Sequence, residues 1–376
     1  MLPTGRMTVL MPALVAAALA AMTGSAFADA TIAVNGPITG PYAVFGDQMK
    51  RGAEFAAAEI NAKGGLLGQQ IKTLVGDDAC DPKQAVSVAN KDVTEGVKVV
   101  IGHYCSGSSI PASAVYQEAN MLQITPASTN PKFTDEAAAK GWWNVFRTCG
   151  RDDTQGVTDA RFLVSHYKDK RIAVLHDKSP YGKGLADETV KGLEKAGVKP
   201  AMYEAYNPGE KDYTAIITRL KAEKIDVVFV GGYHTEVGLM LREAQDAGYK
   251  GQWMSGDANA TDELRAIAGA ASDGFLMTFG PDQRNNPAAK DVVAAMRKTG
   301  FDPEGYTLYT VAAVQVWSTA VKAAGSYDAK KVAEQIRGKS FDTVIGKLTY
   351  DQKGDVLDPK YNVYVWKGGK YSEYTN

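Results

Sequence analysis

Residues 101–109 read IGHYCSGSS, a hydroxyl-rich turn between an apolar strand and the start of a helix. The run Val97–Ile101 that leads into it is rich in β-branched residues, which favour strands. The unpaired N–H groups and the dipole of a helix N-terminus attract an anion. A second such turn, TPAST at 125–129, follows the next apolar strand, so both strand ends can converge on one small carboxylate. The two turns together predict a site for a small acid or an amino acid.

Strands and helices alternate in the same way along most of the chain. The strands are apolar nearly throughout and the helices between them are amphipathic, which is typical of parallel sheets covered by helices on both faces. We therefore predict an α/β fold with two open sheets in tandem. In the first series, strands are expected at 31–34, 71–75, 98–101 and 122–125 and helices at 47–62, 84–95 and 111–120; in the second, which begins after 144–147, strands at 171–176, 202–206, 226–230, 252–255 and 274–279 and helices at 154–167, 182–196, 213–223 and 236–247.

The C-terminal part departs from this alternation. Helices are expected at 288–299, 307–324 and near 329–337, and they are followed by runs with period-2 apolar patterning at 344–350 and 361–366. These last strands can return to either sheet. Each domain is then discontinuous, and a chain that crosses between domains several times forms a hinge.

The first 28 residues have the features of a cleavable secretory signal. One cation, Arg6, precedes the apolar run Val9–Ala21, and the residues SAFA at 25–28 fit a small-residue cleavage site. We expect cleavage near Ala28 and export to the periplasm. The apolar run is short for a membrane anchor, and no cysteine that could carry a lipid follows the cleavage site. The remainder of the 376 residues exceeds what one hydrophobic core usually serves, which favours two domains.

The charge of the chain limits its partners. The formal net charge is −1 and there is no basic run, so the sequence has no electrostatic footprint for nucleic acid or for an anionic membrane. The partner is expected to be a small molecule or another protein. No heptad pattern favours a stable dimer, so we expect a monomer.

The chain contains three cysteines: Cys80, Cys105 and Cys149. If the chain is exported to an oxidising compartment, two of them can form a disulfide. Cys80 and Cys105 each follow a predicted strand and should lie near one edge of the same sheet, so we expect a disulfide between them and a leftover Cys149. The sequence has no C-x-x-C motif and its four histidines are scattered, which gives little support for a metal site. Nothing in the sequence demands a cofactor.

Catalysis has little support in the sequence. The chain contains no H-E-x-x-H, G-x-S-x-G, G-x-G-x-x-G or G-x-x-x-x-G-K-[ST] motif. Ser106 and His103 invite a hydrolase interpretation, but across a strand end they should point in different directions, and no acid is evident to orient the imidazole. A binding protein is therefore preferred to a periplasmic enzyme.

Six residues fall at the carboxyl ends of predicted strands, where open α/β sheets bind ligands. One domain offers hydroxyls and N–H donors and the other a carboxylate and phenols, a combination that suits a zwitterion, because each buried charge needs a partner. Each residue also has a simpler interpretation: turn or cap residues for the hydroxyls, a solvated turn for the acid and core packing for the phenols. Their shared position at strand ends favours the site. They are Ser106, Ala127, Thr129, Tyr181, Tyr233 and Asp257.

Six longer segments carry a resemblance to a known family. They are GDDACDPKQAV (76–86), VVIGHYCSGSSIPAS (99–113), ITPASTNP (124–131), RIAVLHDKSPYGKGLA (171–186), VFVGGYHTEVGLMLREAQDAG (228–248) and IGKLTYDQKGD (345–355). Together they closely resemble the periplasmic leucine/isoleucine/valine-binding proteins. The resemblance covers essentially the whole mature chain, in order, and is more specific than any single motif.

This resemblance implies a type I periplasmic binding fold. In that fold two Rossmann-like lobes, joined by three crossover strands, close over an amino acid and deliver it to an ABC permease with its ATPase subunits. The implied division is a signal at 1–28, an N-terminal lobe of 29–148 plus 281–357, and a C-terminal lobe of 149–280 plus 358–376. The resemblance also supports the Cys80–Cys105 pairing. An alternative is an amino-acid-sensing receptor of the same fold that signals to a membrane partner.

The resemblance also implies a set of ligand contacts. The ligand carboxylate would be held by the hydroxyls and N–H groups of Ser106 and Thr129, with Tyr233 contributing from the opposite lobe. The ammonium group would meet the Ala127 carbonyl, the Thr129 hydroxyl and Asp257. The side-chain pocket would be formed by Phe45, Tyr104, Ser128, Tyr181 and Tyr306.

Three departures from the family's pattern bear on ligand size. Familiar members often carry Glu where this chain has the shorter Asp257 and Leu where it has Tyr104, and Tyr306 replaces a less polar aromatic residue. The bulk at 104 and 306 should reduce the space for a leucine side chain. We therefore expect a receptor for branched-chain or other small neutral amino acids, with valine or isoleucine at the upper size limit and alanine, proline or γ-aminobutyrate admitted.

Overall fold

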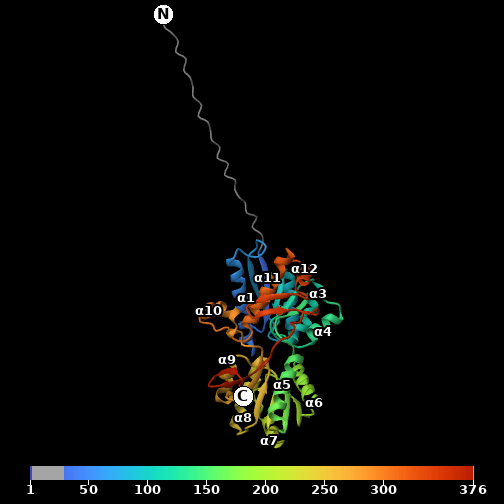
Figure 1. Ribbon diagram of the computed structural model, residues 1–376, viewed down its shortest axis with the longest axis vertical. Coiled ribbons are helices and arrows are strands. Elements are labelled where there is room, and N and C mark those ends of the chain that lie inside the picture. Colours follow the sequence, from blue (N-terminus) through green and yellow to red (C-terminus); the bar gives the residue numbers. More distant parts are fainter. Residues whose placement is uncertain (2–28, 376) are drawn as a thin grey trace.

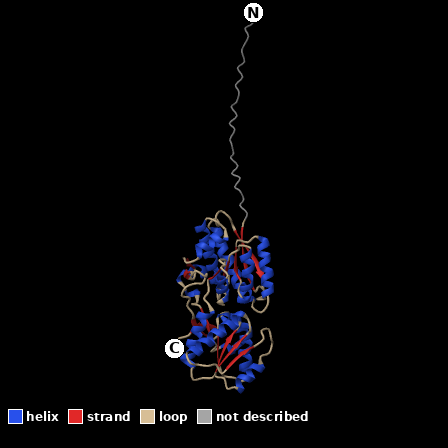
Figure 2. Ribbon diagram, turned by 90° about the vertical axis from the view of Figure 1, so that its right-hand side faces the viewer, coloured by secondary structure: helices blue, strands red, loops and turns tan. Residues whose placement is uncertain are grey.

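The computed structural model describes Met1 and residues 29–375, which form two α/β lobes stacked along the long axis of the molecule (Figure 1). In each lobe, helices cover a largely parallel sheet (Figure 2), as the alternation of strands and helices predicts. The signal segment expected at 1–28 lies, apart from Met1, outside the described residues. Of the helices that the structure describes, none combines the length and apolarity needed to cross a bilayer.

The first lobe is built on a parallel sheet with strand order β2-β1-β3-β4-β5. Helices α1 and α11 pack together, as do α2 and α3, so segments from both ends of the chain cover this sheet. Its elements are β1 (Ala30–Gly36), α1 (Ala43–Ala62), β2 (Ile71–Asp77), α2 (Pro82–Glu95), β3 (Val99–Gly102), α3 (Ser106–Glu118), β4 (Gln123–Thr125), α4 (Lys132–Ala139), β5 (Val145–Arg147), α11 (Thr307–Ala324) and α12 (Ala329–Ile336), and Figure 1 shows α10 (Lys290–Lys298) beside it.

The second lobe is built on a sheet with strand order β14-β13-β10-β9-β8-β6-β7. The strands β6 to β10 are parallel, and β13 and β14 add an antiparallel edge. Its elements are α5 (Asp152–Tyr167), β6 (Ile172–His176), α6 (Pro180–Lys195), β7 (Met202–Ala205), α7 (Thr214–Ala222), β8 (Val227–Gly231), α8 (His234–Asp246), β9 (Gln252–Ser255), η1 (Asp257–Asn259), α9 (Asp262–Ala268), η2 (Gly269–Ser272), β10 (Leu276–Phe279), β13 (Asn362–Lys367) and β14 (Lys370–Glu373).

The C-terminal strands divide between two places. β13 pairs with β10 in antiparallel register, from Leu276 opposite Val365 to Phe279 opposite Asn362. By contrast, β11 (Ser340–Thr343) and β12 (Gly346–Thr349) form a separate hairpin, and β11 packs on α11. Within residues 29–375 the chain therefore passes between the lobes three times: after β5, after β10 and before β13. We call these segments the first, second and third passages.

Local sequence rules located most of the helices and strands. Asp81 is the N-cap of α2, and its carboxylate accepts the N–H groups of Lys83 and Gln84 at 2.9 and 2.8 Å. The predicted start of α3 at Pro111 is wrong, because the helix begins at Ser106 and holds Pro111 in its interior. Four short elements, α4, α9, β11 and β14, were not predicted.

Cys80 and Cys105 form the expected disulfide, with a Cα–Cα distance of 5.5 Å. The bridge joins the loop after β2 to the residue that precedes α3. It therefore ties the hydroxyl-rich turn at 101–109 to the carboxyl edge of the first sheet. Cys149, in the first passage, is buried and free, as expected.

Candidate ligand-binding site

A small cavity, partly open to solvent, lies between the two lobes, where the carboxyl ends of their strands face each other. Its empty volume, including space open to solvent, is about 180 Å³, and only about 10 Å³ of it can take the centre of a water molecule. Both lobes contribute to its wall, and seven of the ten predicted site residues belong to it. The lining residues are Tyr104, Ser106, Ala127, Tyr181, Tyr233, Asp257, Ala258 and Tyr306. The expectation that open α/β sheets bind ligands at the carboxyl ends of their strands therefore predicted most of this wall.

Asp257 provides the acidic group of the second-lobe wall. It begins η1, directly after β9, and is only 2% exposed. The Tyr181 hydroxyl donates to Oδ1 at 2.8 Å, and the hydroxyl of Tyr306, at the start of α11, donates to Oδ2. Burial raises the pKa of Asp257, while the hydrogen bonds from Tyr306 and Tyr181 act in the opposite direction and lower it. Asp257 is thus a buried, oriented acceptor rather than a solvated turn residue.

Ser106 provides donors on the opposite wall. It is the first residue of α3 and is buried. Its Oγ accepts the backbone N–H of Asn130 at 3.2 Å, which leaves its own hydroxyl hydrogen to donate elsewhere. The N–H groups in the first turn of a helix have no acceptor inside the helix. This wall therefore suits a carboxylate.

The loop after β4 carries three further predicted contacts, which differ in placement. Ala127 lines the cavity, whereas Ser128 Oγ bonds to Ser109 Oγ at 2.7 Å and to the Tyr104 carbonyl at 2.9 Å and so braces the loop. Among the described residues, the buried Thr129 hydroxyl has no hydrogen-bond partner of good geometry. A buried hydroxyl without a partner is costly, so a ligand group that pairs with it would be stabilised.

Aromatic rings restrict the size of the cavity. Tyr104 stacks on Phe45 with ring centroids 4.4 Å apart, and Phe45 meets Tyr306 edge-on at 6.2 Å. Phe45 therefore lies behind two lining tyrosines rather than on the wall itself. Because aromatic neighbours support both tyrosines, their rings restrict the space available to a ligand side chain.

Hydrogen bonds also join the two lobes directly. The Asn130 side-chain amide donates to the Pro180 carbonyl at 2.6 Å, and the Thr235 hydroxyl donates to the Pro41 carbonyl at 2.8 Å. Each bond joins a loop of the first lobe to a helix start of the second.

Further acids lie in the protein interior beside the cavity. Asp152 and Asp159, both on α5, are fully buried. Burial raises the pKa of each carboxyl group, and the nearby charge of Asp257 raises it further. Within residues 29–375, neither Asp152 carboxyl oxygen has a hydrogen-bond partner of good geometry; the adjacent Thr129 hydroxyl nevertheless lowers the pKa of Asp152. Burial thus favours the neutral form of these two carboxyl groups, and a cationic ligand group next to Asp257 would act in the opposite direction by favouring ionised carboxylates.

A second, larger cavity of about 710 Å³ lies on the hinge side. All three passages contribute to its wall, through residues 148–150, 280–281 and 356–361, and it shares Asp257 and Tyr306 with the first cavity. Its wall does not include Ser106 or Ala127, so it lacks the donor side of the first cavity. For this reason we place the candidate ligand site in the cavity between the lobes.

Cys149 lines the hinge-side cavity and is expected to resist thiol reagents in the folded protein. Burial raises the pKa of its thiol to about 12, and the thiolate is the reactive form. At pH 8, alkylation by iodoacetamide should be on the order of 10³-fold slower than that of an ordinary exposed cysteine. Time-resolved labelling followed by mass spectrometry measures the rate, with guanidinium-unfolded protein as the control. Rapid labelling of the native protein would contradict this prediction.

Several residues that support the site were missed at the level of sequence. Ala258 lines the cavity, and its N–H donates to the Tyr181 hydroxyl at 3.2 Å. The Gln155 amide hydrogen-bonds to Asp257 and lowers its pKa. Arg147 lies fully buried behind the loop that follows β4. A usable signal existed for Arg147, because a charged residue that ends a predicted buried strand needs a partner.

The chain is similar to known proteins along nearly all of its length. Residues 29–370 match the family model described as periplasmic binding protein. The Leu/Ile/Val-binding protein homolog 1 of Brucella suis biovar 1 is 50% identical over 359 residues, which cover 95% of this chain and 96% of that protein. The leucine-, isoleucine-, valine-, threonine-, and alanine-binding protein of Pseudomonas aeruginosa is 44% identical over 336 residues, 89% of each chain.

The fold is also found among solved structures. The crystal structure of a leucine binding protein from Thermotoga maritima matches with a TM-score of 0.84 and 26% sequence identity. The match covers 92% of this chain and 98% of that one, so it includes both lobes.

Proposed function

We propose that this chain, which belongs to the periplasmic binding protein family, binds a small neutral amino acid between its lobes and delivers it to an ABC importer. Proteins of this family bind solutes and are not enzymes, so the chain is a binding protein. The names of its relatives include branched-chain amino acids, threonine and alanine. These names indicate amino acids as the class of ligand, and the size of the cavity favours the smaller members of that class.

The observation that carries the proposal is one small cavity between the lobes with opposite chemistry on its two walls. Ser106 and the first turn of α3 present donors on one side. Asp257, oriented by Tyr181, is the acceptor on the other. An amino acid carries a carboxylate and an ammonium group, and each needs a partner once solvent is excluded. A zwitterion placed across the cavity satisfies both walls.

We assign the contacts accordingly. The ligand carboxylate meets the hydroxyl and N–H groups of Ser106 and Thr129, with the Tyr233 hydroxyl approaching from the second lobe. The ammonium group meets the Ala127 carbonyl, the Thr129 hydroxyl and Asp257. Support comes from the position of four of these residues on the cavity wall and from the burial of the fifth, Thr129, whose hydroxyl lies beside Asp152.

Binding is proposed to involve rotation of the lobes about the three passages. The lobes are residues 29–148 plus 281–357 and 149–280 plus 358–376. The pairing of β13 with β10 supports the last boundary, because it returns the C-terminal segment to the second sheet. We further propose export through the signal at 1–28 with cleavage near Ala28, action as a monomer, and release of the ligand to a permease with its ATPase subunits.

Titration calorimetry against a panel of amino acids tests the proposed ligand class. We expect measurable binding of valine, alanine, proline or γ-aminobutyrate and weaker binding of leucine, because Tyr104 and Tyr306 occupy the space of a longer side chain. Tight binding of leucine, with none of the smaller ligands, would refute the size argument.

A variant at position 104 sharpens this test. Tyr104→Leu should shift the preference toward leucine over alanine by roughly tenfold, the range that small changes in an apolar pocket produce. Tyr203→Leu is the matched control, because Tyr203 is 44% exposed and lies on the outer strand β7. An unchanged preference in Tyr104→Leu would mean that Tyr104 does not limit ligand size.

A further inference from the structure

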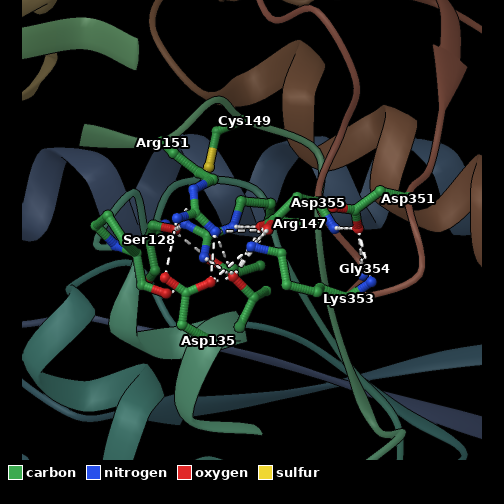
Figure 3. A network of polar contacts seen from close by, with 12 residues as sticks. Ser128, Asp135, Arg147, Cys149, Arg151, Asp351, Lys353, Gly354 and Asp355 are labelled. Carbon is green, nitrogen blue, oxygen red and sulfur yellow. Dashed lines mark hydrogen bonds and ion pairs between the residues drawn. The ribbon is translucent and has the colours of Figure 1, made fainter. Parts of the chain in front are cut away.

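The loop that carries Ala127 and Thr129 is held from behind by one buried guanidinium group (Figure 3). Arg147 is the last residue of β5 and is 0% exposed. Its Nη1 donates to the Ser128 carbonyl at 2.6 Å, and its Nη2 donates to the Asn130 carbonyl at 3.1 Å. These two carbonyls flank Thr129. The rigid planar fork of the guanidinium therefore fixes the backbone on both sides of that residue.

Arg147 is itself oriented by groups from elsewhere in the chain. Its Nε forms an ion pair with the buried Asp355, 2.8 Å from Oδ1 but without hydrogen-bond geometry, and its Nη2 also donates to the Thr134 hydroxyl at 3.0 Å. Arg151 Nη1 lies 2.7 Å from Oδ2 of the same carboxylate, and the Thr134 hydroxyl donates to it at 2.9 Å. Figure 3 shows Arg147, Arg151 and Asp355 close to one another beside Ser128. The charge of Arg147 is thus compensated, and its orientation is set by residues of the first and third passages.

The carboxylate of Asp355 is placed by a tight turn in the third passage. One oxygen of Asp351 accepts the N–H groups of Lys353, Gly354 and Asp355 at 2.8, 2.9 and 2.9 Å. Gly354 has a φ of +100°, and a Cβ there would lie 2.2 Å from a backbone oxygen of β5. Only glycine allows the turn to approach so closely. The Arg147 N–H donates to the Gly354 carbonyl at 3.1 Å, which fixes the turn against the strand.

We infer that Arg147, oriented by Asp355, is the positioning residue for Thr129 and sets ligand affinity without touching the ligand. Arg147 does not line the cavity, so it acts only through the loop. The inference rests on the proposed amino-acid site, because Thr129 matters for affinity only if the ligand is bound there. Since Asp355 lies in the third passage, the same ion pair connects the binding loop to the hinge.

The primary test is Arg147→Lys, which keeps the charge but replaces the fork by a single flexible ammonium group. With L-valine as the probe, the affinity measured by calorimetry should fall at least about tenfold, which corresponds to about 1.4 kcal/mol. Hydrogen exchange of residues 127–130 in the unliganded variant should become faster. Arg151→Lys is the matched control, because Arg151 also pairs with Asp355 but donates to neither the Ser128 nor the Asn130 carbonyl. This variant should have a lower melting temperature, but its affinity for L-valine should fall by less than that of Arg147→Lys.

A double-mutant cycle separates positioning from general loosening of the fold. If Arg147 acts through Thr129, the loss of affinity caused by Arg147→Lys should be much smaller in a Thr129→Ala background. In a Tyr233→Phe background, altered in the other lobe, the two losses should add. Wild-type affinity in Arg147→Lys, or full additivity with Thr129→Ala, would overturn the inference.

Two further arms keep the test decisive. If Arg147→Lys does not fold, Asp355→Asn replaces it, because this variant keeps the shape of the side chain and removes the orienting charge. Its affinity for L-valine should also fall, but by less than that of Arg147→Lys. An unchanged affinity in Asp355→Asn would overturn the inference. If the wild-type protein binds no amino acid, the proposed function fails. Hydrogen exchange then decides alone, and unchanged exchange at 127–130 in the variant overturns the positioning role.

Discussion

Replacing Asp257 by alanine is expected to weaken amino-acid binding by on the order of 10²-fold or more. An ammonium group in this cavity would lose its carboxylate partner, since among the residues that the structure describes Asp257 is the only acid on the cavity wall. A buried charge that loses its partner costs about 3–5 kcal/mol, and about 3 kcal/mol already corresponds to that factor. Titration calorimetry with L-valine measures the change. Asp212→Ala, an exposed acid of the same lobe, is the matched control and should bind as the wild type does.

The pH dependence of binding gives an independent check on Asp257. Burial raises the pKa of this carboxyl group above its ordinary value, and only the ionised form can pair with an ammonium group. Affinity should therefore be full above the raised pKa and fall as the pH decreases through it, at a higher pH than an ordinary carboxyl group would require. Asp257→Asn should remove this dependence. Unchanged affinity in both variants would exclude Asp257 from the site.

Removing the Cys80–Cys105 disulfide, by replacing both cysteines with alanine, is expected to lower the free energy of unfolding by about 3.5 kcal/mol. The bridge closes a loop with a sequence separation of 25, and loop closure of that length in the unfolded chain accounts for this value at 25 °C. Cys105 also lies between Tyr104 and Ser106, so the ligand wall should loosen and the affinity for L-valine should fall. Guanidinium unfolding followed by circular dichroism measures the first effect, and calorimetry the second.

Cys149→Ala is the matched control for the disulfide variant, because Cys149 is buried but unbridged. It should cause a smaller loss of stability, limited to the removal of one small side chain. Reduction of the wild-type protein should reproduce the effect of the double replacement. If neither the double variant nor the reduced protein unfolds earlier than the oxidised wild type, the bridge does not stabilise the lobe.

Most of the candidate wall could be predicted because it depends on local order along the chain. Ser106, Tyr181 and Tyr233 each stand a few residues after a strand, and the carboxyl ends of parallel strands share one edge of a sheet. The direction of a side chain, by contrast, could not be predicted from the sequence. Ser128 turns toward Ser109, and Phe45 packs behind the wall, because neighbouring elements compete for those side chains.

The start of α3 shows the same limit for secondary structure. Proline is favoured in the first turn of a helix, so the sequence pointed to Pro111 as the start. The helix instead begins at Ser106, immediately after the bridged Cys105. A covalent tie to a distant loop and the packing of α3 on α2 outweigh the local preference. The five additional residues place Ser106 in the first turn, where it contributes to the donor wall.

The sequence by itself determined the alternation of strands and helices, the parallel sheets and the edge at which a ligand can bind. These features follow from periodicity and capping among residues close together in the chain. Only the tertiary structure decided that β13 joins β10, and that Asp355 reaches Thr134, 221 residues away, to orient Arg147 behind the binding loop. These contacts join residues that are far apart in the chain, so local sequence rules cannot predict them. The folded chain has to bring the partners together, because a buried charge is stable only beside a partner.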